Sequence, residues 1–180
     1  AAPDTSPILS PDRRMPLPRI TPFGWLVAAS FAFGLGFGVY LTVFANFVAQ
    51  DLQIRPDQLG LLESIREIPG LLTIVLAAIV MTVAEPRVGA IALVLLGAGW
   101  INYFHLNSME SLIGFSLLAS VGFHMWMPVA NTLALQLSDP SVHGRRLGQI
   151  RSVQAVAQLS GIGLVGLLAG VTGLRPLFLL

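Results

Sequence analysis

Beyond residue 22, the chain alternates between long apolar segments and short polar links. The five apolar segments cover about residues 23–49, 59–84, 86–104, 111–137 and 152–174. A helix rises about 1.5 Å per residue, so roughly 20 apolar residues cross a hydrocarbon core about 30 Å thick. Each segment is therefore predicted to be a transmembrane helix. Because the links are short, we expect consecutive helices to pack as antiparallel neighbours.

The two ends of the chain do not follow this pattern. Residues 1–22 contain six of the twelve prolines, together with several charges. Because proline removes a helical N–H group and fixes φ, we expect a proline-rich extended tail there and a transmembrane bundle over residues 23–180. A further apolar run begins at Pro176 and stops at Leu180. We interpret this run as a truncated sixth span and the chain as partial.

The composition argues against a soluble protein. Hydrophobic residues make up 54% of the chain, charged residues only 11%, and the mean hydropathy is +0.78. A typical soluble domain is about 25% charged. The net charge of +1 gives little attraction to nucleic acid, and the lack of cysteine excludes disulfides and thiolate sites. We expect an all-α membrane protein in contact with the lipid bilayer, with no nucleic-acid partner, no metal and no cofactor.

The arginines near the segment ends predict the orientation, because positive residues are enriched in cytoplasmic loops. With the N-terminus inside, Arg55 and Arg175 lie outside, and Arg66 lies within the second segment. The cytoplasmic side then holds seven arginines: Arg13, Arg14, Arg19, Arg87, Arg145, Arg146 and Arg151. We therefore expect a protein of the plasma (inner) membrane with a cytoplasmic N-terminus.

Three charged residues lie near the start of the second segment. Glu63, Arg66 and Glu67 are spaced at i, i+3 and i+4, so they share one face of a helix. Charges within a span usually face a protein interior or a watery cavity. One hypothesis is a substrate or proton site, in which Arg66 binds an anionic group and a carboxylate carries a proton. The alternative is an ion pair that packs the helix or is solvated where it emerges.

The fourth segment carries a polar stripe on an otherwise apolar helix. Its members recur at about every fourth residue: Ser116, Ser120, His124, Pro128 and Asn131. His124 could relay protons, bind substrate or ligate a pigment metal, or it could be a neutral histidine satisfied by a neighbouring helix. Gln154 and Gln158 share a face of the fifth segment. With Asn131, they are further candidates for substrate or proton binding.

Glycine pairs and basic residues point to packing and gating. Gly34 and Gly38, and Gly166 and Gly170, form two G-x-x-x-G motifs, a spacing that lets helices approach closely. We expect them to pack the first and fifth segments within the chain, with a homodimer seam as the alternative.

Arg145 lies next to Arg146 between the fourth and fifth segments. The pair either marks the cytoplasmic side or forms a cytoplasmic gate.

From about Pro22 to Leu180, the chain resembles the N-terminal, six-helix half of a major facilitator superfamily transporter. The resemblance rests on the tail, the span lengths, Gly60-Leu-Leu-Glu63, Pro128 in the fourth span, and Gly144-Arg145-Arg146-Leu-Gly148 before a glycine-rich fifth span. It implies two six-helix bundles around a central cavity, which move a small solute by alternating access. The partners would be that solute and the missing C-terminal half, or other membrane subunits.

The family's motifs are only partly present. The turn between the second and third spans has the family form G-x-x-x-D-R-x-G-R, and here Glu85 takes the place of the aspartate. The resemblance makes Glu85 and Arg87 gate candidates. The family's antiporter signature in the fifth span includes Gly-Pro, but residues 152–174 contain no proline. The sequence therefore gives no support for the drug–proton antiport associated with that signature.

A second hypothesis is a non-transporting scaffold or assembly subunit of a larger membrane complex, such as a photosynthetic one. We do not expect an enzyme. The sequence has no paired aspartates in adjacent spans and no His-Glu-x-x-His motif.

Overall fold

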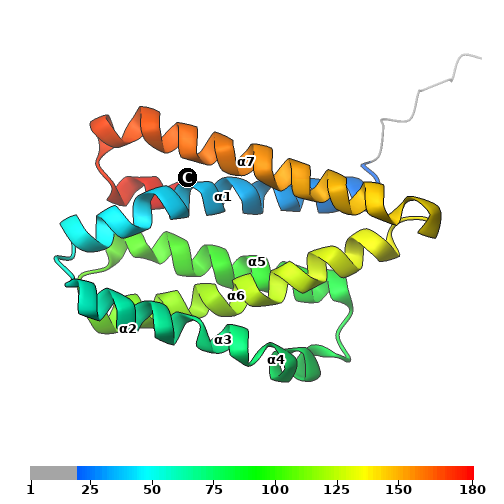
Figure 1. The fold of residues 1–180 in the computed structure, drawn as a ribbon, viewed down its shortest axis with the longest axis horizontal. Coiled ribbons are helices and arrows are strands. Elements are labelled where there is room, and N and C mark those ends of the chain that lie inside the picture. The colour runs from blue at the N-terminus through cyan, green and yellow to red at the C-terminus, as the bar shows by residue number, and fades with distance from the viewer. Residues whose placement is uncertain (1–19) are drawn as a thin grey trace, which may run out of the picture.

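A computed structural model describes residues 20–180, which form helices and contain no strand. Most of the proline-rich tail expected over residues 1–22 lies outside the described residues. The long helices are α1 (Pro22–Gln50), α5 (Glu85–Asn102), α6 (Met109–Gln136) and α7 (His143–Thr172), which lie side by side in Figure 1. With short 3₁₀ extensions, these four helices are long and apolar enough to cross a membrane. The expectation of an all-α membrane bundle is confirmed.

Capping residues fix where the long helices begin. The Thr21 hydroxyl accepts a hydrogen bond from the Gly24 N–H group at 3.1 Å, and proline occupies the first position of α1. Ser108 caps α6 in the same way, through the Ser111 N–H group. The short 3₁₀ helices η1 (Tyr103–His105) and η2 (Pro140–Val142) lie in the links before α6 and α7. They keep these links short, as the sequence predicts.

The apolar segment at residues 59–84 is broken into three helices, although the sequence suggests one span. These are α2 (Pro56–Arg66), α3 (Ile68–Leu71) and α4 (Thr73–Val80), which follow one another along α6 (Figure 1). Pro69 has no N–H group to bond to the preceding turn, and its ring crowds the carbonyl four residues earlier. The Thr73 hydroxyl also donates to the Gly70 carbonyl at 2.6 Å, which competes with regular helix bonding.

Glycines bring the long helices together in two pairs. A Cβ atom on Gly34 or Gly38 of α1 would stand 2.5 Å or 2.2 Å from a backbone oxygen of α7, so these positions permit a close helix contact. A Cβ on Gly122 of α6 would likewise stand 2.4 Å from a backbone oxygen of α5. By contrast, Gly166 and Gly170, which we expected to pack as well, have no atom within 4 Å of an added Cβ.

Residues 175–179, where we expected a sixth span to begin, form a 3₁₀ helix, η3 (Arg175–Leu179), which packs against α1, α5 and α7. Phe178 is buried, and its ring meets those of Phe47 and Tyr103 edge-on, at centroid distances of 5.1 Å and 5.2 Å. This aromatic contact is of a kind that adds stability beyond the buried area. It closes one end of the bundle, so η3 is part of the packed core.

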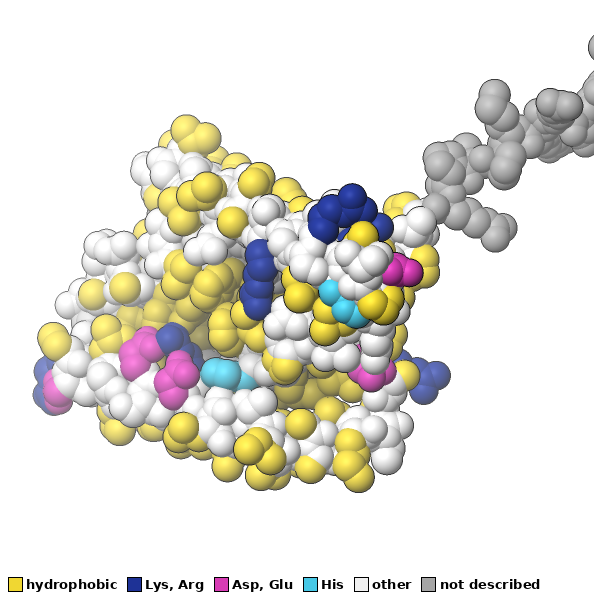
Figure 2. All heavy atoms as spheres, turned by 45° about the vertical axis from the view of Figure 1, so that its right-hand side comes forward, with side chains coloured by type: hydrophobic (Ala, Val, Ile, Leu, Met, Phe, Trp, Pro, Cys, Tyr) yellow, Lys and Arg dark blue, Asp and Glu magenta, His cyan; other side chains and the backbone are white. Residues whose placement is uncertain are grey.

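The outer faces of the bundle are apolar. The most exposed large hydrophobic side chains lie on α3, α4 and α7, and include Leu71, Ile74, Leu167 and Val171. In Figure 2 hydrophobic side chains cover much of the visible surface. In water such a surface would promote aggregation, whereas in a membrane it faces lipid tails. The exposed faces therefore fit an integral membrane protein in contact with the bilayer.

Candidate functional site

A cavity of about 250 Å³ opens between α1, α2, α5, η1 and α6. Its walls are mainly aromatic and aliphatic, and its polar groups are few: Arg66, Glu67, Ser120, His124, and the hydroxyl groups of Tyr40 and Tyr103. Figure 2 shows charged side chains beside a hollow lined with hydrophobic ones. An apolar concave site with a few convergent polar groups is typical of small-molecule binding.

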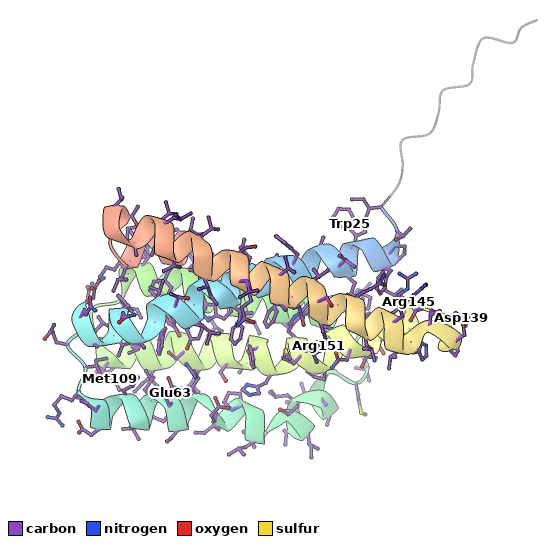
Figure 3. The ribbon with its side chains drawn as sticks, turned by 45° about the horizontal axis from the view of Figure 1, so that its top comes forward. Trp25, Glu63, Met109, Asp139, Arg145 and Arg151 are labelled. Atoms are coloured by element: carbon purple, nitrogen blue, oxygen red, sulfur yellow. The ribbon has the colours of Figure 1, made fainter. Side chains whose placement is uncertain are left out.

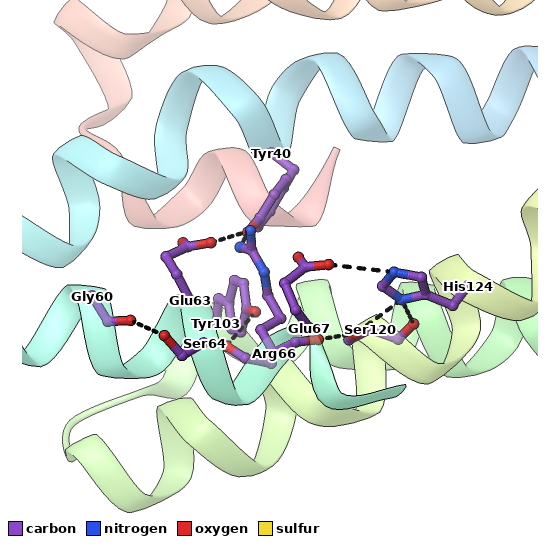
Figure 4. Close-up of polar contacts among 10 residues, drawn as sticks. Tyr40, Gly60, Glu63, Ser64, Arg66, Glu67, Tyr103, Ser120 and His124 are labelled. Atoms are coloured by element: carbon purple, nitrogen blue, oxygen red, sulfur yellow. Dashed lines mark hydrogen bonds and ion pairs between the residues drawn. The ribbon is translucent and has the colours of Figure 1, made fainter. Parts of the chain in front are cut away.

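Arg66, the last residue of α2, points toward α1 (Figure 4). It forms an ion pair with Glu63 and donates a hydrogen bond to the Tyr40 hydroxyl. Its guanidinium also lies 5.7 Å and 5.6 Å from the ring centroids of Tyr40 and Phe44, within the range of cation–π attraction. The side chain is only 22% exposed. Arg66 is therefore already held and neutralised by its neighbours in the bundle.

Glu67 differs from Glu63, because no arginine pairs with it. Its side chain is 60% exposed, and its one charged or chargeable partner among the described residues is His124, with 3.6 Å between Oε2 and Nε2 (Figure 4). A carboxylate that faces a cavity without a fixed counter-charge can bind a cation or a proton. Glu67 is the acidic group of the site that is left free to do so.

The hydrogen bonds around His124 define which ring nitrogen carries hydrogen. The Ser120 hydroxyl donates to the backbone carbonyl of Arg66, so its oxygen can only accept from His124. Nδ1 of His124 lies 3.1 Å from that hydroxyl oxygen and 3.0 Å from the Ser120 carbonyl oxygen. Neither oxygen has a hydrogen to donate to Nδ1, so Nδ1 carries the hydrogen, and Nε2 of the neutral ring presents a lone pair to Glu67. A proton placed between Nε2 and the carboxylate would satisfy both groups.

Gly70 allows α3 to approach this pair. A Cβ atom at position 70 would stand 2.5 Å from Nε2 of His124, closer than side chains tolerate. The break in the helix near Pro69 therefore has a local consequence, since it places a residue without a side chain against the imidazole. The sequence pattern did not predict this contact.

Sequence reasoning missed the aromatic wall of the cavity. Tyr40 and Trp100 stack with centroids 5.0 Å apart, and Phe37 and Phe123 lie 5.4 Å apart. Tyr103 is fully buried and shares a 2.8 Å hydrogen bond with Ser116 of the polar stripe. One signal was available: both tyrosines of the chain fall at span depth, where a phenol hydroxyl needs a partner.

Asn131, Gln154 and Gln158 do not lie in this cavity. Asn131 accepts a hydrogen bond from Arg151 at 3.2 Å, and Gln154 accepts one from the same guanidinium at 3.4 Å. Gln158 lies on α7 where its backbone contacts Gly38. Figure 3 places Arg151 toward the Arg145 end of the bundle, away from Glu63. These residues belong to the contacts of α7 with α1 and α6.

The four gate candidates lie at the end of the bundle where α5 and α7 begin. Glu85 accepts a hydrogen bond from Gln136 at 2.9 Å, which ties the start of α5 to the end of α6. Arg146 stacks on Phe23, 4.3 Å from the ring centroid. Arg87 and Arg145 are exposed and form no ion pair within residues 20–180. The structure does not bring the four together.

The link beside the gate candidates has an acidic residue of its own. Asp139 accepts hydrogen bonds from the N–H group and the hydroxyl of Ser141, at 2.8 Å and 2.6 Å. These bonds stabilise the carboxylate and lower the pKa of Asp139.

No group of three or more His, Asp or Glu side chains is placed to hold a metal ion within the described residues.

Comparison with known proteins fits this arrangement. Neither the curated proteins nor the solved structures contain a match to the chain. The family model of the Major Facilitator Superfamily matches residues 26–180, from the first turns of α1 to the last residue. This range includes α5, α6 and α7, all of α1 except its first turn, and every residue that lines the cavity. The chain therefore belongs to the major facilitator superfamily.

Proposed function

We propose that the chain forms one half of a solute transporter, in which the cavity between α1, α2, α5 and α6 is its share of the solute site. Membership of the superfamily makes it a transporter of the major facilitator type. The solute would reach Arg66, Glu67 and His124 from one side of the membrane and leave toward the other by alternating access. The other half of the cavity would come from a C-terminal bundle or another membrane subunit.

The observation that supports this proposal is the position of the charged groups. Arg66 and Glu67 line one side of an aromatic cavity, and Glu63 is paired with Arg66, inside a bundle whose outer faces are apolar. Ionisable residues within an apolar bundle are costly to keep and mark substrate or ion pathways. The carboxylate of Glu67 does not pack α2 onto a neighbour, because it is largely exposed beside the cavity.

The Glu67–His124 pair is the proposed proton site. The lone pair on Nε2 and the carboxylate oxygen face each other at 3.6 Å, an arrangement that a proton stabilises. A solute charge that reaches Glu67 would alter the affinity of this pair for the proton, and a proton on His124 would alter the affinity for the solute. Such reciprocity is the thermodynamic basis of coupled transport.

We further propose that the protein lies in the plasma (inner) membrane with its N-terminus in the cytoplasm. Arg87, Arg145, Arg146 and Arg151 would then be cytoplasmic, in line with the enrichment of positive residues there. Glu85 and Arg146, which already tie helix ends together, would serve as a cytoplasmic gate.

Solute uptake tests the proposed function. The protein, produced from its whole gene and reconstituted in liposomes, would be offered a mixed panel of cationic, anionic and neutral solutes, with uptake measured by mass spectrometry. Substitution of Glu63, Arg66 or Glu67 by alanine should lower uptake of the transported solute at least tenfold. Glu110→Ala is the matched control, because this exposed carboxylate lies at the start of α6 outside the cavity.

Two results would contradict the proposal. Unchanged uptake in all three cavity variants would remove the transport role from this site. Uptake of no solute by the intact protein would favour the scaffold hypothesis, which predicts stable co-purification with other membrane subunits.

A further inference from the structure

We propose that the cavity recognises an organic cation, an amine or quaternary ammonium group on an apolar or aromatic body, whose positive charge pairs with Glu67. This inference rests on the proposed function, because it names the solute class of the same site. It replaces the expectation that Arg66 binds an anionic group. Three features support it: the charge balance of the site, its aromatic walls, and the position of His124.

The charge balance favours a cation. The site contains two carboxylates, Glu63 and Glu67, and one guanidinium, Arg66, so with a neutral His124 its net charge is negative. Arg66 is paired with Glu63 and bonded to Tyr40, and an anionic solute would have to displace these contacts. Glu67 has no arginine to displace. A positive group can reach it at little cost, because the carboxylate is 60% exposed.

The walls of the cavity suit the same ligand. Phe37, Tyr40, Trp100 and Phe123 supply aromatic rings around the space into which Glu67 opens. The negative faces of such rings attract cations, and aromatic enclosures bind quaternary ammonium groups for this reason. They also hold an apolar body. Arg66 already uses the attraction between Tyr40 and a cation, since its guanidinium lies over that ring.

His124 makes the binding of a cation depend on protons. Histidine is the side chain whose charge ordinarily changes between pH 5 and 8. A proton on Nε2 would pair with Glu67 and compete with the ligand for it. The other titratable groups around the cavity are Tyr40 from α1, Tyr103 from η1, and the Glu63–Arg66 pair of α2. The α5 wall adds only Leu96 and Trp100, which do not titrate, so Glu67 and His124 dominate the pH dependence of cation binding.

Exchange of a cation for a proton at Glu67 and His124 does not require the Gly-Pro signature that residues 152–174 lack. It involves no covalent step: one cation leaves Glu67 as one proton arrives on the Glu67–His124 pair, so the charge of the site stays balanced.

The experiment compares two soluble probes of similar size and opposite charge, benzyltrimethylammonium and benzenesulfonate. Their binding to the purified protein in detergent would be measured by isothermal titration calorimetry at pH 8. We expect the cation to bind at least tenfold more tightly than the anion. Glu67→Gln should weaken cation binding at least tenfold, and Glu110→Gln, an exposed carboxylate outside the cavity, should leave it unchanged.

A pH series on the unaltered protein keeps the test independent of any folding defect. Between pH 8 and pH 5.5 the affinity for the cation should fall, and His124→Gln should flatten that fall. The inference is overturned by tighter binding of the anion, by binding of neither probe, or by cation binding that Glu67→Gln leaves unchanged. Each of these results is separate from failure of the proposed function, because solute uptake that requires Arg66 and Glu67 could persist with an anionic or neutral solute.

Discussion

At the scale of single residues, the candidate site depends on which atoms still have bonding capacity. Ser120 uses its hydroxyl hydrogen on the Arg66 carbonyl, and this single bond turns the Nε2 lone pair of His124 toward Glu67. Arg66, by contrast, has its charge neutralised by Glu63. Two neighbouring carboxylates on one helix face thus have different chemistry. The difference lies in their partners and not in their residue type.

Gly70 provides a residue-scale test of this geometry. Gly70→Ala places a methyl group where only 2.5 Å separates it from Nε2 of His124, so the imidazole or α3 must shift. We expect the proton dependence of cation binding to flatten as in His124→Gln, with the protein still folded. Calorimetry at pH 8 and pH 5.5 measures it. Gly60→Ala is the control, since an added Cβ there meets no atom within 4 Å. An unaltered pH response in Gly70→Ala would contradict the assigned contact.

The sequence predicted the charged part of the site but not its walls. The spacing of Glu63, Arg66 and Glu67 places them on one face, and the polar stripe pointed to His124. Aromatic residues in apolar segments give no such signal, because they serve equally well in a core, against lipid or around a ligand. That Tyr40 and Trp100 line the cavity depends on how α1 and α5 are rotated, which is set by tertiary packing.

At the scale of helices, two identical motifs have different surroundings. Gly34 and Gly38 lie against the backbone of α7, whereas Gly166 and Gly170 face open space. A G-x-x-x-G spacing indicates only that a close approach is possible. Whether another helix packs against that face depends on the rest of the fold. For the same reason the five apolar segments could be predicted from length and hydropathy. The break of the second segment into α2, α3 and α4 could not be predicted in this way, because it depends on the effect of Pro69 on its neighbours.

The contact between α1 and α7 yields a stability prediction. In Gly38→Ala the new Cβ would stand 2.2 Å from the backbone oxygen of Gln158, which cannot move without shifting the helix. We expect the free energy of unfolding to fall by about 1–3 kcal/mol, the usual cost of overpacking. Thermal unfolding in detergent measures the change.

Gly166→Ala serves as the comparison for that prediction. It makes the same chemical change in the same class of motif but meets no atom within 4 Å, so it should leave the unfolding midpoint unchanged or raise it, because alanine favours helix over glycine. Equal destabilisation by the two substitutions would show that the close approach at Gly38 has no special weight.

At the scale of the whole molecule, the two ends of the bundle differ in how their arginines are paired. At one end Arg55 forms an ion pair with Asp57, and Arg175 one with Asp51. At the other end, Arg87 and Arg145 are exposed and have no carboxylate partner within the described residues. Unpaired positive charges on the second end should be retained on the cytoplasmic side during insertion. The long helices run between these ends, so fixing one link fixes the orientation of all of them.

The lack of cysteine in these 180 residues makes this orientation directly testable. Thr82 lies in the link between α4 and α5, and Asn107 in the link between η1 and α6, so α5 separates them and they mark opposite ends. Both positions are exposed. A membrane-impermeant maleimide added to intact cells should label Asn107→Cys, and should label Thr82→Cys only after the membrane is permeabilised. The reverse pattern would place the N-terminus outside, and the Glu85 and Arg146 contacts could then not be a cytoplasmic gate.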